Sequence, residues 1–403
     1  MTVVVWALGC SSPVPAPDPG PAVTYHRDVA PLLQRSCVSC HVEGGIAPLA
    51  LDTYVAAKEN AAALAAQVLA RRMPPWPPAG GCNTYLHDRA LGDEEIQTLS
   101  RWVELGAPEG DEASAPAAVS SKEPVIRHDV TLLPQAPYTP APREGWTDVN
   151  RCFLLDPKLE VDGQVVGYEV KPGNRGMVHH AMLYVVEDQT LQEEMASADA
   201  LDSQPGFDCA DGFTDTSTLR WVGGWSPGET ATRLPHGLGI SLPKSAKVRM
   251  EIHYNIVNGK APDLTEVYFE LATDLRIATT LAVENIPGFT VPAGEGTSVE
   301  SRWVNTGSAM TVYAVFPHMH LLGTTIGVEV IRANDASSHC LVNVPRWDYR
   351  WQQFYFFEQP VTVATGDSVR LRCTYVNTSA EEVFAGWRSA DEMCTWMLLV
   401  GSP

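Results

Sequence analysis

The stretch VRMEIHYNI, residues 248–256, alternates apolar and polar side chains at every position. Successive side chains of a β-strand point to opposite faces, so this period of two predicts a strand with one buried face. Similar patterns occur at 310–316, 369–375 and 393–400, separated by Gly, Pro and Asn turns. We therefore expect about 270 residues of short strands, arranged as two all-β sandwich domains.

The composition is that of a chain with a large interior and an acidic surface. Its 403 residues suggest two or three domains, and 45% of them are hydrophobic while 19% are charged. The 48 acidic and 28 basic residues give a net charge of −20. This balance argues against a nucleic-acid partner, because such binding needs clustered Lys and Arg. A run of about 18 apolar residues, as a spanning helix requires, does not occur.

The N-terminal quarter has a helical pattern instead. Residues 93–105 place Ile96, Leu99 and Val103 on one face of a helix, and the Ala- and Leu-rich residues 60–73 precede two prolines. The low-complexity stretch APEGDEASAPAAVSSKEP, from residue 107, predicts a linker. We expect five regions: a truncated lipoprotein-type signal and tether (1–23), a small all-α domain (24–110), a linker (111–136) and the two sandwiches (137–285 and 286–403).

The first residues have features of an export signal. Small residues precede Cys10, and the Ser-, Pro- and Ala-rich residues 11–22 follow it, which resembles a bacterial lipoprotein cleavage site and its tether. The segment lacks a charged start and a full apolar length, so an incidental apolar terminus is the alternative to lipid attachment at Cys10. Export to the periplasm or cell surface would permit disulfides and covalent haem attachment.

The sequence CVSCH at residues 37–41 is the attachment motif of a c-type haem. The thiols of Cys37 and Cys40 can form thioethers to the two vinyl groups, and His41 presents an imidazole to the iron. The alternatives are half of a zinc site or a redox pair, but a second CxxC or CxxH does not follow. We therefore expect one covalently bound c-type haem.

The other axial ligand of that iron must come from a different segment. Met73 ends a helical stretch just before Pro74-Pro75-Trp76, where prolines favour an extended loop that can hold a thioether over the haem. A Met ligand raises the reduction potential and suits electron transfer. His87 is the competing ligand. Residues 24–110 resemble a small c-type cytochrome domain of the kind attached to bacterial exported oxidoreductases.

Five histidines fall in three segments of the predicted strands, at His179-His180, at His253 and in HMH at 318–320. Residues i and i+2 of a strand share a face, so His318 and His320 can chelate one metal ion. Adjacent His179 and His180 can do so only at a bulge or a strand end. His253 is on the polar face of its strand, available to a metal or to solvent.

Met393 begins the last predicted strand and adds a thioether to these candidates. Two imidazoles and a thioether form a soft site suited to Cu(I), whereas three imidazoles accept copper or zinc. A single His in a strand is more often an ordinary polar residue, but five in three segments are harder to explain in that way.

Five motifs in the later part of the chain carry a resemblance to a known family. They are GMVHHAM (176–182), RLPHGLG (233–239), EIHY (251–254), FPHMH (316–320) and DEMC (391–394). In order and spacing they resemble the copper type II ascorbate-dependent monooxygenases, which include peptidylglycine alpha-hydroxylating monooxygenase and dopamine beta-monooxygenase. Over roughly residues 137–403, the resemblance implies two jelly-roll-like sandwiches, each holding one copper ion and facing the other across a solvent-filled cleft.

The resemblance also implies roles for individual residues. His179, His180 and His253 would hold an electron-storing copper, and His318, His320 and Met393 an oxygen-activating copper. It further implies one disulfide between Cys373 and Cys394 and another between Cys152 and Cys209. It offers no partner for Cys82 or Cys340.

The family chemistry implies that a substrate C–H bond is hydroxylated with O2 and two electrons, one of which crosses from the His179-side copper. Glu251, two residues before His253 on the same face, would orient that imidazole or is simply a solvated carboxylate. The peptide-hydroxylating member grips a carboxylate where this chain has Phe316, Thr395 and Met397. An apolar lining cannot pair a buried carboxylate, so we expect a small, rather apolar substrate.

The fused haem region is a second departure from that family, whose usual reductant is ascorbate. A tethered haem raises the local concentration of a one-electron donor. We hypothesise that an external donor, either ascorbate or a redox protein, reduces the haem, which reduces the His179-side copper and through it the His318-side copper.

Two other functions compete with an exported haem- and copper-dependent monooxygenase. One is a non-catalytic electron-transfer or copper-binding lipoprotein that keeps the metals without turnover. The other is a zinc hydrolase at the three-His site, although these motifs supply no evident general base.

Overall fold

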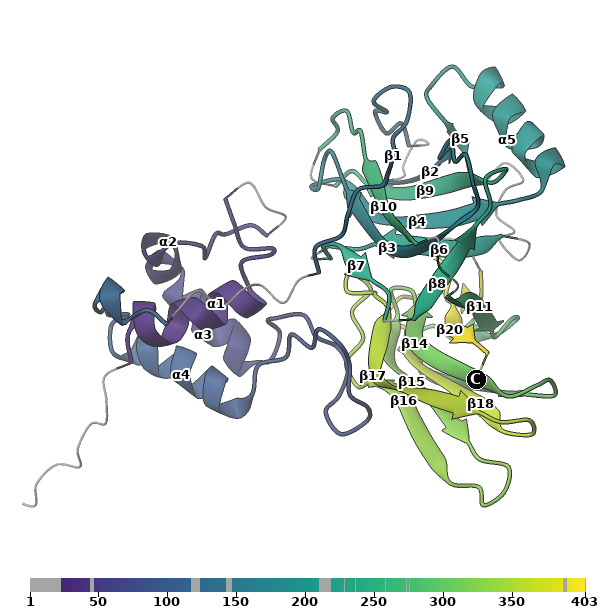
Figure 1. Cartoon of the computed structure of the whole chain (residues 1–403). Helices are drawn as coiled ribbons and strands as arrows, with labels where there is room; N and C mark the ends of the chain where they lie inside the picture. The colour runs from purple at the N-terminus through teal and green to yellow at the C-terminus, as the bar shows by residue number, and fades with distance from the viewer. Residues whose placement is uncertain are drawn as a thin grey trace, which may run out of the picture.

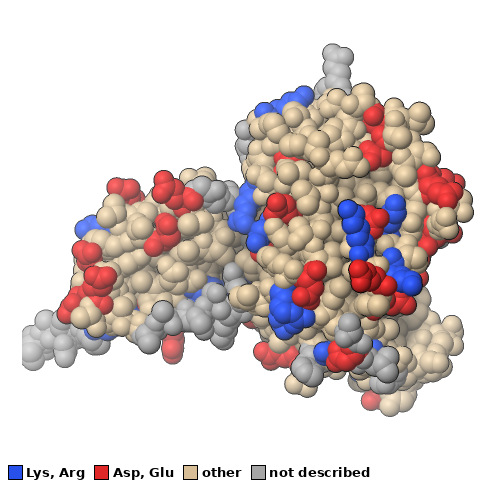
Figure 2. Space-filling model, turned by 45° about the horizontal axis from the view of Figure 1, so that its top comes forward, with Lys and Arg blue, Asp and Glu red and all other residues tan. Residues whose placement is uncertain are grey.

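The computed structural model describes residues 23–43, 47–116, 124–142, 147–209, 219–227, 229–235, 237–257, 259–272, 274, 276–386 and 390–402. A helical part at the N-terminus stands beside two stacked β-sandwiches (Figure 1). The predicted lipoprotein-type segment with Cys10, and His236 of the RLPHGLG motif, lie outside the described residues. On the face shown in Figure 2, acidic side chains are spread over the helical part.

The helical part packs around its own apolar core. Its elements are η1 (Tyr25–Val29), α1 (Ala30–Ser36), α2 (Tyr54–Glu59), α3 (Ala61–Leu69), α4 (Asp93–Glu104) and η2 (Glu112–Ser114). Helix α4 buries Ile96, Leu99 and Trp102. Its first turn contains three acidic residues, whose negative charges interact favourably with the helix dipole and stabilise the helix. Helix α3 ends earlier than its Ala-rich pattern predicted, because the chain turns at Arg71, which has a φ of 50°. Among the described residues, none of the helices is both long and apolar enough to cross a membrane.

The first sandwich packs a five-stranded sheet against part of a nine-stranded sheet. The five-stranded sheet has the order β5 (Phe207–Asp208), β2 (Asp148–Leu155), β9 (Lys247–Asn255), β4 (Val178–Val186) and β6 (Arg220–Trp225). The facing strands are β1 (Val130–Leu132), β10 (Glu266–Ala272), β3 (Gly163–Lys171) and β8 (Leu238–Leu242), with β7 (Thr232–Arg233) beside β3. Helix α5 (Gln189–Leu201) follows β4. The predicted strand at 248–256 is thus confirmed as β9, and it lies at the centre of its sheet.

The nine-stranded sheet continues into the second sandwich. Parallel pairing of β8 with β11 (Ile277–Asn285) leads on to β20 (Cys394–Gly401), β14 (Met310–Met319) and β17 (Tyr355–Val363). These strands face the sheet β13 (Gly296–Val304), β18 (Ser368–Val376), β15 (Gly323–Ile331) and β16 (Ser338–Val344), and β12 (Thr290–Val291) pairs with β19 (Val383–Phe384). Both sandwiches are therefore built partly from one shared sheet.

The predicted linker, residues 111–136, is only partly a linker. Its C-terminal end forms β1, which pairs with β10 from Val130 opposite Phe269 to Leu132 opposite Val267. Val130 and Leu132 are both buried, and a strand three residues long gives too little alternation to be recognised from the sequence.

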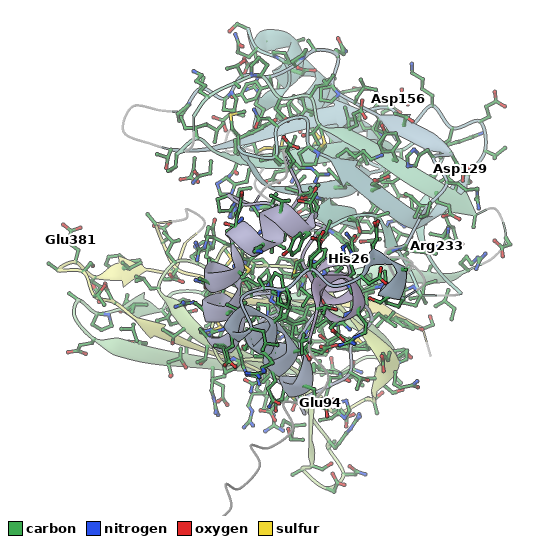
Figure 3. All side chains as sticks on the ribbon, turned by 90° about the vertical axis from the view of Figure 1, so that its left-hand side faces the viewer. His26, Glu94, Asp129, Asp156, Arg233 and Glu381 are labelled. Atoms are coloured by element: carbon green, nitrogen blue, oxygen red, sulfur yellow. A yellow bond between two sulfur atoms is a disulfide. The ribbon has the colours of Figure 1, made fainter. Side chains whose placement is uncertain are left out.

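One segment of the predicted helical domain packs on the second sandwich. This docking segment, residues 76–87, buries Tyr85 in the core of that sandwich, where its hydroxyl donates to the Leu341 carbonyl at 2.9 Å. Backbone bonds run from Ala79 N–H to Asn343 O and from Leu86 N–H to Phe356 O, both 2.8 Å. Viewed from the helical side, the helices that carry His26 and Glu94 stand in front of the sandwiches (Figure 3).

A disulfide joins the docking segment to the second sandwich, through two cysteines whose pairing the sequence left open. It links Cys82 to Cys340 on β16, across 258 residues of sequence. The two disulfides that the resemblance implied, Cys152–Cys209 and Cys373–Cys394, are also present. Cys373 lies on β18 and Cys394 starts β20, so this last bridge ties the start of β20 to the facing sheet.

Replacing Cys82 and Cys340 by Ser should loosen the docking segment. Removing a native disulfide typically costs about 2–5 kcal/mol, and only the packing of Tyr85 and the hydrogen bonds would then hold the segment. We expect a lower thermal midpoint and faster cleavage of residues 76–87 in limited proteolysis. Unchanged cleavage would mean that packing of Tyr85 alone keeps the segment docked.

Candidate metal centres

The first candidate centre joins neighbouring strands of the five-stranded sheet. His179 and His180 lie on β4 and His253 lies on β9. The register between these strands shifts between Val178 and His180, so that Val178 faces Tyr254 and His180 faces His253. The shift is the bulge that joint use of two adjacent histidines requires. The extra residue turns both imidazoles toward His253.

The three imidazoles have the geometry of a metal site. One nitrogen of each lies within 4.8 Å of the others, and Nδ1 of His179 is 3.2 Å from Nδ1 of His180. Two nitrogens bound to one ion, each at about 2 Å, lie about 3 Å apart. Burial lowers the pKa of His179 to about 4 and that of His180 well below its ordinary value. Both rings are therefore neutral at pH 7 and offer lone pairs, as metal ligands must.

The carboxylate that orients His253 is Asp148, on the neighbouring strand β2. Its Oδ1 lies 2.9 Å from His253 Nε2 and accepts a second bond from Asn255 at 3.1 Å. The bond from His253 lowers the pKa of Asp148. With Nε2 donating its proton, Nδ1 is left for a metal ion. Sequence reasoning missed Asp148, which lies 105 residues away from His253.

Glu251, which the sequence offered for this orienting role, has another partner. It accepts from Arg249 Nη2 at 2.9 Å and lies beside the Cys152–Cys209 disulfide. Arg249 is fully buried, so Glu251 balances a buried cation. Arg249 and Glu251 lie on the same side of the sheet because residues i and i+2 of strand β9 share a face.

Replacing Asp148 by Asn should weaken copper binding at the His179 centre by about 10–100-fold, the usual effect of losing an outer-shell partner. The amide cannot fix the proton on His253 Nε2 as a carboxylate does. Competition titration with a Cu(I) chelator measures the affinity, and Glu251→Gln is the matched control. An unchanged affinity in Asp148→Asn would contradict this role for the carboxylate.

The second candidate centre begins at the end of β14. His318 and His320 share a face, with ring centroids 5.0 Å apart. His318 Nδ1 donates to Oε1 of Gln352, and His320 Nδ1 donates to the Asp391 carbonyl at 3.0 Å. Each ring therefore has Nε2 left for a metal ion. Burial lowers the pKa of His318 to about 3, which keeps it neutral.

The pairing of β20 with β14 indicates where Met393 lies relative to these histidines. Strand β20 pairs with β14 so that His318 faces Thr395 and Met319 faces Cys394. One further step in this register sets Met393 opposite His320, on the face that His318 shares. Met393 is 7% exposed. The backbone register therefore places Met393 on the same face as the two imidazoles.

Glu392 fixes this arrangement and was not recognised from the sequence. Its fully buried carboxylate accepts from the backbone N–H groups of His320, Leu322 and Met393. Burial raises the pKa of Glu392 to about 7. A single side chain thus ties the strand end that carries His320 to the residue that carries the thioether.

Aromatic side chains line the approach to His318. Phe316 stacks on His318, with ring centroids 6.2 Å apart. The ring centroid of Phe354 lies 5.1 Å from that of Phe316 and 4.5 Å from that of Trp221. Met397 is the cross-strand partner of Phe316. The surroundings of His318 are therefore apolar on this side.

The CVSCH motif follows helix α1, and its side chains suit a covalent haem. Neither Cys37 nor Cys40 is in a disulfide, and burial raises the pKa of the Cys37 thiol to about 12. His41 Nδ1 donates to the Leu49 carbonyl at 2.9 Å, which leaves Nε2 for iron. Met73 follows α3, with its N–H bonded to Gln67 O at 3.4 Å, and its role as a ligand remains a prediction.

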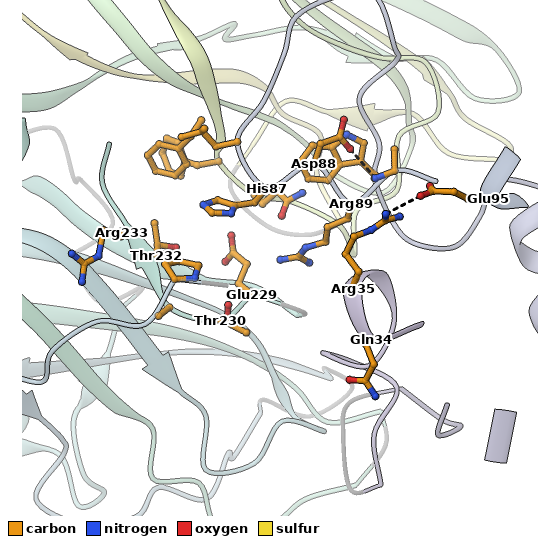
Figure 4. A pocket seen from close by; sticks show the side chains of 18 residues that line it. Gln34, Arg35, His87, Asp88, Arg89, Glu95, Glu229, Thr230, Thr232 and Arg233 are labelled. Atoms are coloured by element: carbon orange, nitrogen blue, oxygen red, sulfur yellow. Dashed lines mark hydrogen bonds and ion pairs between the residues drawn. The ribbon is translucent and has the colours of Figure 1, made fainter. Parts of the chain in front are cut away.

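A cavity of about 410 Å³ lies where the helical part meets both sandwiches. Its walls include Arg35, His87, Glu229 and Phe354, and Figure 4 shows His87 and Glu229 facing each other. Burial raises the pKa of Glu229 to about 7. His87, the competing haem ligand, therefore lies beside residues of the sandwiches.

Comparisons with known proteins agree with this geometry. Residues 297–399, which contain the second centre, match the C-terminal domain of copper type II ascorbate-dependent monooxygenases. DBH-like monooxygenase protein 1 of Mus musculus is 26% identical over 283 residues, which cover 64% of this chain and 45% of that protein. Peptidyl-glycine alpha-amidating monooxygenase A of Xenopus laevis is 23% identical over 268 residues, which cover 63% of this chain and 26% of that protein. The chain thus spans less than half the length of these curated relatives.

Solved structures add little. The major capsid protein P2 from bacteriophage PM2 aligns with a TM-score of 0.27 and 9% identity, over 68% of this chain and 97% of that chain. A score this low supports no inference about the fold or the function.

Proposed function

We propose that this chain is an exported copper monooxygenase. The matches to copper type II ascorbate-dependent monooxygenases support this proposal. The chain would hydroxylate a C–H bond of a small, rather apolar substrate with O2, using electrons that arrive through a fused c-type haem. The observation that carries the proposal is the grouping of His179, His180 and His253 within 4.8 Å, and a strand register that sets Met393 on the face of His318 and His320 supports it. These residues come from segments far apart in the sequence.

Copper held at the two centres would cycle between Cu(I) and Cu(II) and so supply two electrons, which together with the two electrons of the C–H bond reduce O2 to one alcohol oxygen and one water. The side chains prepare each centre for this role. His318 and His320 direct Nε2 inward because their Nδ1 protons are engaged, and the thioether of Met393 favours Cu(I) over zinc. Glu392 and the Cys373–Cys394 disulfide hold the Met393 backbone in place.

The substrate class follows from the side chains beside His318. Phe316, Met397 and Phe354 present apolar surface, and the hydroxyl of Thr395 is engaged with Asn285 at 2.8 Å. A substrate carboxylate buried here would lose its hydration without gaining a cation, which is unfavourable. A small molecule with an apolar C–H group suits this wall better.

The haem would be held by Cys37, Cys40 and His41, with Met73 as the other axial ligand. The helical part that carries these residues is docked on the second sandwich through residues 76–87 and the Cys82–Cys340 disulfide. Docking would hold the haem in a fixed position relative to the candidate copper centres, so that electron delivery would not depend on diffusion. An external one-electron donor, ascorbate or a redox protein, would reduce the haem. Three disulfides favour export, to the periplasm or cell surface, since thiols stay reduced in the cytosol.

Labelled oxygen tests this function most directly. Copper-loaded protein with ascorbate and ¹⁸O₂ is incubated with a panel of small substrates that contain weak C–H bonds, and the products are analysed by mass spectrometry. We expect one ¹⁸O atom in an alcohol product, with less incorporation for substrates that carry a carboxylate near the reacting carbon. Copper binding with no oxygen uptake across the panel would favour an electron-transfer or copper-binding protein instead.

A further inference from the structure

The loop between β16 and β17, residues 345–354, touches both candidate copper centres. Trp347 Nε1 donates to the His320 carbonyl at 3.0 Å, and Gln352 accepts from His318 Nδ1. Tyr349 reaches the other centre, where its ring stacks on His179 with centroids 5.1 Å apart and planes inclined by 22°. The same ring stands edge-on to His320, with centroids 6.1 Å apart and an angle of 88°.

The position of the Tyr349 ring is fixed by its own loop. Gln352 Nε2 donates to the Tyr349 carbonyl at 2.7 Å, and Trp351 N–H closes a turn onto Asp348 O at 2.9 Å. Trp347, which is 9% exposed, anchors the loop start through its N–H to Thr324 O at 2.8 Å. Gln352 and Trp347, which fix the loop that carries Tyr349, are thus also the residues that hydrogen-bond to His318 and His320.

A single aromatic ring therefore stands between one ligand of each centre. Electron transfer slows steeply with every gap between groups that are not bonded, and parallel and edge-on ring contacts at these distances are close packing. The path from His179 across Tyr349 to His320 has no gap wider than a ring contact. The resemblance had implied a solvent-filled cleft in this place.

We propose that Tyr349 is the contact through which one electron passes from the His179 centre to the His318 centre. This inference rests on the proposed function. In each turnover O2, the substrate C–H bond, two electrons and two protons give one alcohol and one water. One of the two electrons leaves Cu(I) at the His179 centre, which becomes Cu(II), and crosses Tyr349 to the other centre. The other electron comes from the copper at His318, His320 and Met393.

Flash photolysis of carbon monoxide measures this step without substrate turnover. Half-reduced, copper-loaded protein is treated with CO, which holds the electron on the copper it binds, and a light pulse then lets the electron redistribute. Cu(II) EPR of each variant, recorded before the flash, reports whether both centres are intact. The variants are Tyr349→Leu, which removes the ring, and Tyr349→Phe, which keeps it. Tyr268→Leu is the control, since Tyr268 also stacks on a histidine, His128, at 3.9 Å.

We expect Tyr349→Leu to slow redistribution by about tenfold or more, which corresponds to a barrier higher by about 1.4 kcal/mol or more, because leucine leaves a gap where the ring contacts both histidines. Tyr349→Phe and Tyr268→Leu should keep the rate, with two copper ions per chain and unchanged EPR in all variants. An unchanged rate in Tyr349→Leu would overturn the proposal, as would equal slowing in Tyr349→Phe, or loss of copper from Tyr349→Leu. Failure of the unsubstituted protein to bind two copper ions would instead contradict the proposed function.

Discussion

Met393→Ile should abolish oxygen uptake while leaving the protein folded and copper bound at the His179 centre. Isoleucine fills a similar volume at this buried position, so the loss of packing is small. The sulfur is lost, however, and with it the soft ligand that favours Cu(I) beside His318 and His320. The fall in turnover should exceed the ~10–100-fold effect of removing an outer-shell partner, because a ligand itself is removed.

An oxygen electrode measures turnover in this variant, and X-ray absorption at the copper edge reports whether a Cu–S contact is present. Met310→Ile is the matched control, because Met310 begins β14, at the far end of the strand from His318, and is only partly buried. We expect Met310→Ile to retain both oxygen uptake and the Cu–S contact. Oxygen uptake at the unsubstituted rate in Met393→Ile would show that the thioether has no part in the reaction.

Cys37→Ala combined with Cys40→Ala should remove covalently bound haem completely. Both thioether bonds need these thiols, whereas the candidate copper centres lie in sandwiches with separate apolar cores. Haem absorbance of the denatured protein measures attachment after expression in a host that attaches c-type haem. Copper content should stay at two ions per chain, and oxygen uptake driven by a protein donor should stop.

Ser39→Ala is the control for this pair, since Ser39 lies between the two cysteines and should not affect attachment. Zinc bound to Cys37 and Cys40 in the unsubstituted protein, with no covalent haem, would contradict the haem assignment. It would leave the copper centres untouched, because none of their ligands belongs to the helical part.

Local patterns predicted the strands and the two sandwiches well. Alternation gave β9 to within one residue at each end, and of the two ways in which His179 and His180 could act jointly, a bulge or a strand end, the register of β4 contains the bulge. Such features depend on neighbours in sequence, since the side-chain period of a strand and the two-for-one count of a bulge are local. The resemblance supplied two disulfides that spacing alone could not.

Contacts between distant segments could not be predicted in the same way. Asp148 meets His253 because β2 pairs with β9, and Cys82 meets Cys340 because residues 76–87 dock on β16. Tyr349 lies in a loop without periodicity, and its role depends on how the sandwiches stack. The parallel pairing of β8 with β11, which continues one sheet through both sandwiches, likewise has no signal within either strand.

Anomalous diffraction at the copper edge from crystals of the copper-loaded protein tests the central claim most directly. Two separate copper peaks should appear, one among His179, His180 and His253 and the other among His318, His320 and Met393, with the Tyr349 ring between them. A single peak, or a second peak that lies away from the Met393 sulfur, would contradict an oxygenase built on two mononuclear copper centres.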